Sequence, residues 1–235
     1  MAANWAARMD AAGCAQQHGF GLQLTPEDGG AWHLSCAELT SALNALADHG
    51  RERAVSGPWR NEQLDVRNAQ GDWLATVERA AVRVLGIATE AVHLIASTPD
   101  GRMWVQQRAW NKPTHPGLWD TLMGGMVSAG DDVPAALARE TMEEAGLAQS
   151  QLQHVRYGGR VKFACPSAEG GPGMGYMHEC IHWYHAICPE GTTPENTDGE
   201  VAQFVCLPEQ ELQAWAVQGR FTPEASLILA AYWGW

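Results

Sequence analysis

The spacing of apolar and polar residues predicts a chain of two parts, with the change near residue 89. The first part contains three predicted helices and one strand: helices over residues 4–17, 39–46 and 77–85, and a strand over residues 59–67. Gly86 follows the last helix as a stop signal. We therefore expect a small N-terminal accessory α+β domain over residues 1–88.

The second part, residues 89–235, mixes strand and helix patterns. Strands are predicted over residues 92–97, 103–108, 121–125, 154–163, 177–187 and 201–207, and helices over 133–145 and 223–233. A Pro-Asp-Gly turn joins the first two strands into a hairpin, and Asp132 precedes its helix as an N-cap. The Gly-rich residues 169–175 are expected to form a mobile loop. The fold class predicted is α+β with a mixed sheet.

Composition and charge argue against several classes of partner. The 235 residues are 46% hydrophobic and 18% charged, which is typical of a folded chain. Fifteen basic against 27 acidic residues give a net charge of −12. This charge argues against nucleic acid or an anionic membrane as the main partner. No apolar stretch approaches the ~20 residues of a membrane span.

The cysteines and the first residues suggest a cellular compartment. Six cysteines occur in the chain, and no two of them form a C-x-x-C pair. A chain of this size does not need disulfides for stability, so we expect free, buried thiols in a reducing cytoplasm. The first ten residues lack the pattern of a secretory signal.

One predicted helix carries an unusual set of carboxylates. Glu140, Glu143 and Glu144 stand at i, i+3 and i+4 and so share one face. The opposite face is small and apolar, and we expect it to press against a sheet; it contains Ala135, Ala138, Met142 and Ala145. No Lys or Arg stands at i+4 to offset the acidic residues. A hard cation such as Mg²⁺ or Mn²⁺ would remove the repulsion, whereas the alternative is a solvated acidic face.

The segment from Gly125 to Leu147 resembles the signature of the Nudix hydrolases, G-x5-E-x7-R-E-U-x-E-E-x-G-U. Six of its seven fixed letters match: Gly125, Arg139, Glu140, Glu143, Glu144 and Gly146. With average residue usage, chance would give this about once in ten million starting positions. Asp131 replaces the remaining Glu but can still accept a hydrogen bond from Arg139. Thr141 replaces an aliphatic residue and should still pack.

The resemblance implies a Nudix-type α/β/α sandwich that hydrolyses an organic diphosphate. Its Mg²⁺ ions would bind Glu140, Glu143 and Glu144, with a carbonyl of Gly124 or Gly125 completing the ligands, and would lower the pKa of a bound water. Arg139 would hold Asp131 and a ligating glutamate in position. A further acid often acts as ligand or base, and Glu200 is the candidate. The alternative for Glu200 is an ordinary loop carboxylate.

A narrower resemblance concerns the substrate. Five segments look like the Nudix proteins associated with thiamine pyrophosphokinase, which carry an extra N-terminal domain: residues 58–62, 78–87, 92–94, 107–120 and 198–201. This resemblance implies cleavage of thiamine diphosphate, or of oxidised or antivitamin analogues such as oxythiamine diphosphate, to the monophosphate and phosphate. Because many relatives pair, a homodimer is an open alternative to a monomer.

Two cations and two tryptophans are candidate substrate contacts. Arg108 and Lys112 follow a predicted strand and could hold the terminal phosphate; the alternative is an exposed loop pair. Trp110 and Trp119 flank Lys112 and could stack on a flat substrate ring, with plain packing as the alternative.

Other readings of the sequence are less favoured. Residues 107–119 also resemble isopentenyl-diphosphate isomerase, but the Cys and His which that enzyme needs are missing from residues 121–125. His178, Cys180, His182 and His185 look like a zinc cluster, but i and i+4 on one strand lie ~13 Å apart, so we favour sheet or pocket side chains. Two further alternatives are hydrolysis of an oxidised deoxyguanosine diphosphate and a non-catalytic Nudix-fold sensor.

Overall fold

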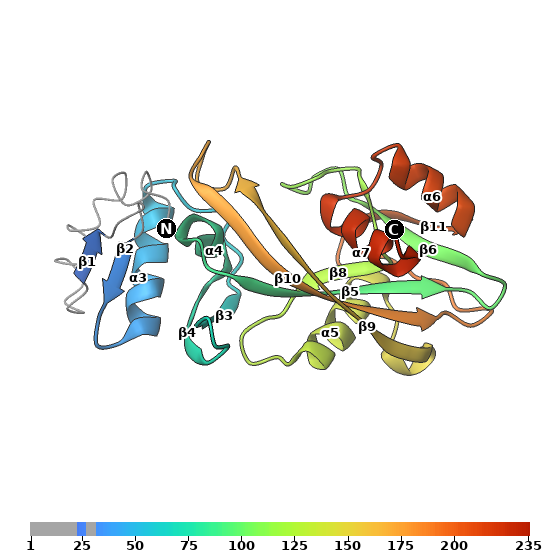
Figure 1. The fold of residues 1–235 in the computed structure, drawn as a ribbon, viewed down its shortest axis with the longest axis horizontal. Coiled ribbons are helices and arrows are strands. Elements are labelled where there is room, and N and C mark those ends of the chain that lie inside the picture. The colour runs from blue at the N-terminus through green and yellow to red at the C-terminus, as the bar shows by residue number, and fades with distance from the viewer. Residues whose placement is uncertain (1–22, 27–31) are drawn as a thin grey trace. The chain divides into compact units, whose positions relative to one another are not determined.

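The computed structural model describes residues 23–26 and 32–235, with side chains from residue 36 onward, and the chain forms two compact units (Figure 1). One unit contains the described residues up to Thr89, together with Ser128–Gly130 and Lys162–Glu179. The other contains Glu90–Val127, Asp131–Val161 and Cys180–Trp235. The predicted helix over residues 4–17 lies outside the described residues, and the division into domains of residues 1–88 and 89–235 stays a prediction.

In its described residues, the first unit contains two small antiparallel hairpins and two helices. Its elements are β1 (Gln23–Pro26), β2 (Trp32–Ser35), α3 (Leu39–Glu52), β3 (Gln63–Arg67), β4 (Trp73–Glu78) and α4 (Arg79–Leu85). β1 pairs with β2, and β3 pairs with β4. The predicted helix over residues 39–46 is confirmed within α3. The predicted strand over residues 59–67 is confirmed only at β3, since residues 59–62 are not strand.

The start of α4 differs from the prediction. Val77 and Glu78 end β4 instead of beginning the helix, because Val77 pairs with Leu64 of β3. The buried Glu78 side chain then caps α4 by accepting a hydrogen bond from the Ala80 amide. Gly86 ends the helix in the left-handed conformation, with φ 69°, as its position predicted.

The second unit contains most of a seven-stranded mixed sheet. Its strands are β5 (Thr89–Ser97), β6 (Arg102–Arg108), β7 (Trp119–Asp120), β8 (Met123–Met126), β9 (Gln153–Ser167), β10 (Gly175–Ile187) and β11 (Val201–Pro208). The order is β11-β6-β5-β10-β9, with β7 on β6 and β8 on β5. β5 pairs antiparallel with β6, which confirms the predicted hairpin. Glu90 near the start of β5 contacts His182, and Ser97 at the end of β5 contacts Cys188. Because residue numbers increase in the same direction along both segments, β5 and β10 run parallel.

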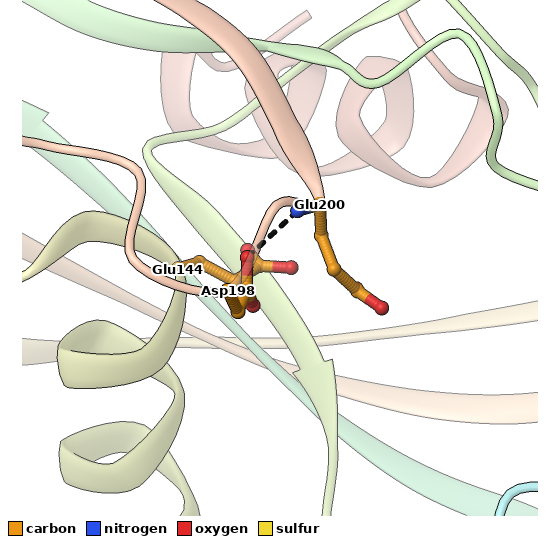
Figure 2. A group of neighbouring side chains, drawn as sticks. All are labelled: Glu144, Asp198 and Glu200. Atoms are coloured by element: carbon orange, nitrogen blue, oxygen red, sulfur yellow. Dashed lines mark hydrogen bonds between the residues drawn. The ribbon is translucent and has the colours of Figure 1, made fainter.

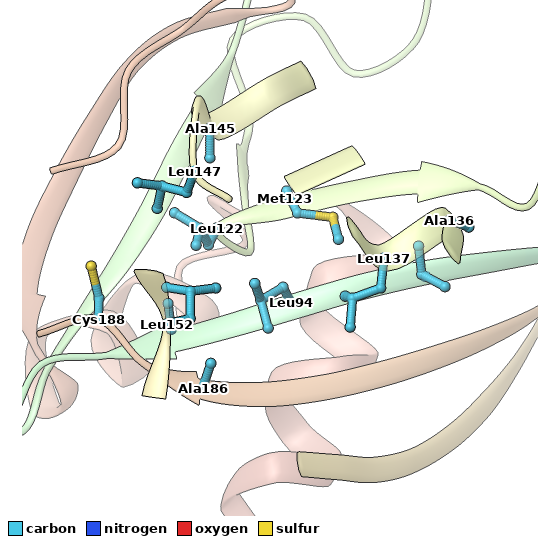
Figure 3. Close-up of a cluster of buried hydrophobic side chains, with 12 residues drawn as sticks. Leu94, Leu122, Met123, Ala136, Leu137, Ala145, Leu147, Leu152, Ala186 and Cys188 are labelled. Carbon is cyan, nitrogen blue, oxygen red and sulfur yellow. The ribbon is translucent and has the colours of Figure 1, made fainter. Parts of the chain in front are cut away.

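Helices cover this sheet on both sides. Figure 1 shows α5 (Val133–Ala145) on one side, and α6 (Glu209–Val217) and α7 (Pro223–Trp233) on the other. The core beneath α5 joins Leu94 and Met123 of the sheet to Leu137 of the helix (Figure 3). The α5 and α7 bounds agree with prediction, whereas α6 was not predicted. No helix in the described part of the chain is long and apolar enough to cross a bilayer.

The ends of α5 agree with the sequence, but its buried face does not. Asp132 accepts a hydrogen bond from the Ala135 amide at 2.8 Å, and Gly146 adopts φ 65° after the last turn. The prediction that Ala135 and Met142 press against the sheet is wrong, since both are exposed. The residues that the helix buries are Ala136, Leu137, Glu140, Thr141, Glu144 and Ala145. Two carboxylates therefore point toward the sheet.

Candidate metal centre

Glycine at the end of β8 makes the inward position of Glu140 possible. A Cβ atom built on Gly125 would overlap the carboxyl group of Glu140. Glycine therefore lets the backbone of β8 and the helix carboxylate approach each other closely. A Cβ on the neighbouring Gly124 would overlap the ring of His93 on β5 in the same way. The two glycines therefore let β8 pack closely against the side chains of Glu140 and His93.

Arg139 ties the loop before α5 to the carboxylates of the helix. Its Nε donates to Asp131 Oδ2 at 3.0 Å, and its Nη1 donates to Glu140 Oε1 at 2.8 Å and to Glu143 Oε2 at 3.0 Å. Its Nη2 donates to the carbonyl of Met126 at 3.2 Å. Burial alone lowers the pKa of Arg139, but the neighbouring carboxylates raise it above its usual value. The predicted contact with Asp131 is thus present despite the shorter side chain.

Glu144 is the most buried carboxylate of the helix, with 4% of its surface exposed. Its Oε2 accepts hydrogen bonds from the Gly124 amide at 3.0 Å and from Gln106 Nε2 at 2.8 Å. Burial raises the pKa of Glu144 to about 8, and the two hydrogen bonds oppose this shift while Glu140 and Asp120 add to it. Both donors lie on one oxygen, so Oε1 accepts none from the described residues.

Glu144 meets two acids from a distant part of the chain. Ligand oxygens of Glu144, Asp198 and Glu200 all lie within 4.8 Å of one another (Figure 2). Asp198 Oδ1 also accepts a hydrogen bond from the Glu200 amide at 2.8 Å, which fixes the turn before β11. The structure therefore brings Glu200 to Glu144 and adds Asp198, which sequence reasoning did not single out. The only signal for it was its place in the Asp-Gly-Glu-Val segment.

We refer to Glu144, Asp198 and Glu200 as the acidic cluster. Glu140 and Glu143 do not join it in this arrangement, because both contact Arg139. The cluster offers only carboxylate oxygens, which is the donor chemistry preferred by Mg²⁺ and Mn²⁺. Beside it, the buried Oε1 of Gln106 has no hydrogen-bond partner among the residues that the structure describes, and it could accept from a bound water. These residues fit a hard divalent cation.

The two predicted phosphate-binding cations lie near acids. The Lys112 ammonium pairs with Glu200 of the acidic cluster. Arg108 donates to the carbonyl of Thr114 through Nε and Nη2, at 3.3 and 3.1 Å, and its Nη1 lies 3.6 Å from Asp120. These contacts hold the Arg108 side chain at the end of β6. Lys112, in contrast, lies directly at the candidate metal centre.

The two tryptophans differ in exposure. Trp119 is 6% exposed, and its ring packs against Trp215 with 4.9 Å between centroids. This burial favours the packing alternative for Trp119. Trp110 is 72% exposed, on the same loop as Lys112. Of the two rings, Trp110 is the one available to a ligand.

The histidines of β10 have separate partners. His182 Nε2 lies 3.3 Å from Glu90, and His185 Nε2 lies 2.9 Å from Ser97. Among the described residues, they do not belong to a group that could hold a metal ion. A cavity of about 340 Å³ lies elsewhere in this unit, lined by residues 98–100, 102, 104, 189–193 and 206. Its lining does not include the acidic cluster.

Comparison with known proteins places the chain in a family. Residues 88–225 match the NUDIX domain. Nudix hydrolase 20, chloroplastic, of Arabidopsis thaliana is 29% identical over 174 residues, which cover 72% of this chain and 44% of that protein. The isopentenyl-diphosphate Delta-isomerase of Rhodobacter capsulatus is 29% identical over 152 residues, covering 64% of this chain and 82% of the isomerase.

The chain spans about half the length of several relatives, between 36% and 57% for four of them. The crystal structure of DR0079 from Deinococcus radiodurans shares the fold, with a TM-score of 0.55 at 20% identity, and the match covers 72% of this chain and 97% of that one. The domain match covers more than half of the sequence and contains the whole acidic helix. The chain belongs to the Nudix family.

Proposed function

We propose that this protein is a Mg²⁺-dependent hydrolase of an organic diphosphate. The observation that carries the proposal is the acidic cluster, in which Glu144 of the Nudix helix meets Asp198 and Glu200. Oxygen-only donors of this kind suit Mg²⁺, with Mn²⁺ as a possible substitute. Glu140 and Glu143 remain proposed ligands that would leave Arg139 when metal binds, and the Gly125 carbonyl remains a proposed ligand.

Hydrolysis transfers a phosphoryl group to water. A bound divalent cation would polarise the phosphorus centre and lower the pKa of a water. The attacking water gives its proton to a carboxylate, for which Glu200 is the candidate, and the bridging P–O bond breaks to release the monophosphate and phosphate. Gly124 and Gln106 hold Glu144 through Oε2, so that Oε1 would be the oxygen left for a metal ion. Arg139 holds the loop at Asp131.

We further propose thiamine diphosphate or its oxidised and antivitamin analogues as the substrate class. Support comes from the five sequence segments that resemble the thiamine-associated Nudix proteins and from the exposed Trp110 ring beside Lys112. An aromatic face attracts a flat or cationic ring, and an ammonium attracts a phosphate. Arg108 remains a proposed contact and would reach the phosphate only on releasing Asp120, whereas the burial of Trp119 favours packing over a substrate contact.

The likeness to an isomerase gives a second candidate reaction. It is favoured by the Rhodobacter relative and by the buried His93 beside Gly124. His93 Nδ1, however, lies 2.9 Å from the Thr121 hydroxyl, and residues 121–125 carry neither Cys nor His. The complete set of Glu140, Glu143 and Glu144 supports hydrolysis.

The proposal also covers the partner, the cellular location and the oligomeric state of the protein. We propose a small-molecule diphosphate as the partner, a cytoplasmic location, an accessory role for residues 1–88 and, as an open alternative to the monomer, a homodimer. The net charge of −12 supports the exclusion of nucleic acid and of anionic membranes as main partners.

A substrate panel tests the proposed reaction. Phosphate release is measured from thiamine diphosphate, oxythiamine diphosphate, ADP-ribose and oxidised deoxyguanosine diphosphate, with and without Mg²⁺. Mg²⁺-dependent release that is fastest with the thiamine compounds supports mechanism and substrate. Release only from nucleotides keeps the mechanism and rejects the substrate. No release with any compound favours a ligand sensor.

A further inference from the structure

Lys112 is the cation that neutralises the candidate metal centre in this structure. Its ammonium contacts Glu200 Oε2, and only 13% of the side chain is exposed. The carboxylate that it contacts belongs to the acidic cluster, together with Glu144 and Asp198. The ionised forms of these acids, whose ligand oxygens lie within 4.8 Å of one another, repel one another unless a positive charge is present. Lys112 supplies one such charge.

The backbone holds Lys112 within reach of the cluster. The Ala109 amide donates to the carbonyl of Glu200 at 2.9 Å, and the Lys112 amide donates to the carbonyl of Ala109 at 3.2 Å. These bonds tie the start of the 109–117 loop to the start of β11. The four-carbon side chain of lysine is flexible, so the ammonium group can move while these backbone hydrogen bonds stay in place. Lys112 can therefore change partners without unfolding the loop.

We propose that Lys112 is a tethered counter-ion, which occupies the acidic cluster when metal is absent and is displaced by Mg²⁺ to bind the substrate phosphate. The inference rests on the proposed function and deepens it. Because an ammonium and Mg²⁺ compete for the same carboxylate oxygen, metal binding breaks the Lys112–Glu200 pair. The released ammonium then faces the incoming diphosphate. Metal binds first and substrate second, and Lys112 then acts as a substrate-binding residue.

The two lysines of the chain allow a direct test. Lys112 and Lys162 are the only lysines in the sequence, and Lys162 is exposed on β9. Trace acetylation with acetic anhydride, read by peptide mass spectrometry, gives the reactivity of Lys112 relative to Lys162. Adding Mg²⁺ without substrate should raise this ratio several-fold, and methylenediphosphonate should then lower it again. A ratio that Mg²⁺ at saturation does not raise overturns the proposal.

Metal binding to variants gives an independent readout. Calorimetry with Mg²⁺ alone should show that Lys112→Met binds the ion about three- to tenfold more tightly, as expected when a partly buried ion pair no longer competes. Lys112→Arg keeps the charge and should bind Mg²⁺ like the wild type, as should the control Lys162→Met. With Mg²⁺ present, Lys112→Met should bind methylenediphosphonate more weakly than the wild type.

The outcomes separate this inference from the proposed function. If wild type and Lys112→Met bind Mg²⁺ equally well, the tethered counter-ion is wrong while the metal-dependent hydrolase stands. If no variant binds Mg²⁺ at millimolar concentration, the proposed function fails and the inference fails with it. Thermal unfolding of Lys112→Met and Lys112→Arg checks that each variant folds.

Discussion

At the residue scale, the environment of Glu144 decides what the helix carboxylates can do. Burial disfavours its charge, whereas the hydrogen bonds from Gly124 and Gln106 favour it. The balance leaves a carboxyl group with its pKa raised to about 8. Metal ligands must be deprotonated, so proton loss at Glu144 and metal binding at the cluster are coupled.

Replacing Glu144 should abolish catalysis while leaving the fold. Glutamine keeps the size of the side chain and an oxygen for Gly124, but it is a poor ligand for a hard cation. We expect turnover of Glu144→Gln to fall by about 100-fold or more, and turnover of Glu143→Gln to fall as well, both measured as Mg²⁺-dependent phosphate release. The exposed Glu211→Gln on α6 is the control. Normal hydrolysis by both helix variants would refute the assignment of α5.

The raised pKa of Glu144 predicts the pH dependence of stability in the metal-free protein. The folded state holds this proton up to pH about 8, whereas the unfolded state releases it near its ordinary pKa of 4.5. Between these values the folded state binds more protons, so the free energy of unfolding falls as pH rises.

In EDTA, the melting temperature of the wild type should therefore fall relative to that of Glu144→Gln from pH 5 to pH 8. A constant difference in melting temperature between the two proteins over this pH range would contradict the raised pKa of Glu144. Metal affinity has the opposite pH dependence: Mg²⁺ affinity should rise as pH increases through about 8, where Glu144 loses its proton.

At the element scale, α5 is positioned by its ends and by the glycine opposite its middle. Asp132 and Gly146 determine where the helix begins and ends, through a side-chain cap and a left-handed residue. These are local effects, and the sequence predicted them. Which face turns inward depends on β8, where Gly125 leaves room for Glu140.

Removing the cap should weaken the helix without changing its chemistry. Asp132→Ala loses the hydrogen bond from the Ala135 amide and should lower the free energy of unfolding by about 1 kcal/mol. Asp132→Asn retains an acceptor and should remain close to the wild type. Denaturant unfolding of both variants measures the difference, and equal loss in the two would show that the cap is not the cause.

Adding a methyl group at Gly125 should disturb Glu140. Because the new Cβ would overlap the Glu140 carboxyl group, we expect Gly125→Ala to lose about 1–3 kcal/mol of stability. Combining it with Glu140→Ala should restore part of this loss, since the overlap disappears. A double-mutant cycle from denaturant unfolding reports the coupling, and strict additivity would exclude a clash with Glu140.

At the scale of the second unit, the sheet brings together groups that are far apart in sequence. The connection between β10 and β11 passes the end of α5, where the Glu195 amide donates to the Ala145 carbonyl at 2.9 Å and the Thr197 hydroxyl contacts the Glu143 carbonyl. These bonds place Asp198 and Glu200 beside Glu144. The candidate centre therefore depends on the packing of a loop against a helix end.

Asp198 should contribute to metal affinity although it lies outside the helix. Asp198→Asn removes one of three charged oxygen donors, and we expect Mg²⁺ affinity to fall by about tenfold or more. Calorimetry with Mg²⁺ measures this change. Glu190→Gln, an exposed acid on the same connection, is the matched control. An equal effect of the two substitutions would mean that only the overall charge matters.

By itself, the sequence determined what depends on neighbouring residues: the hairpin at residues 98–101, the bounds of α5 and α7, and the Nudix signature with its Arg139–Asp131 contact. Such features depend on spacing, caps and turn residues within a few positions. Tertiary structure decided the inward rotation of α5, the start of α4 after β4, the acidic cluster and the Lys112–Glu200 pair. These depend on how strands pair and loops pack across many residues, and local patterns do not encode which distant side chains finally meet.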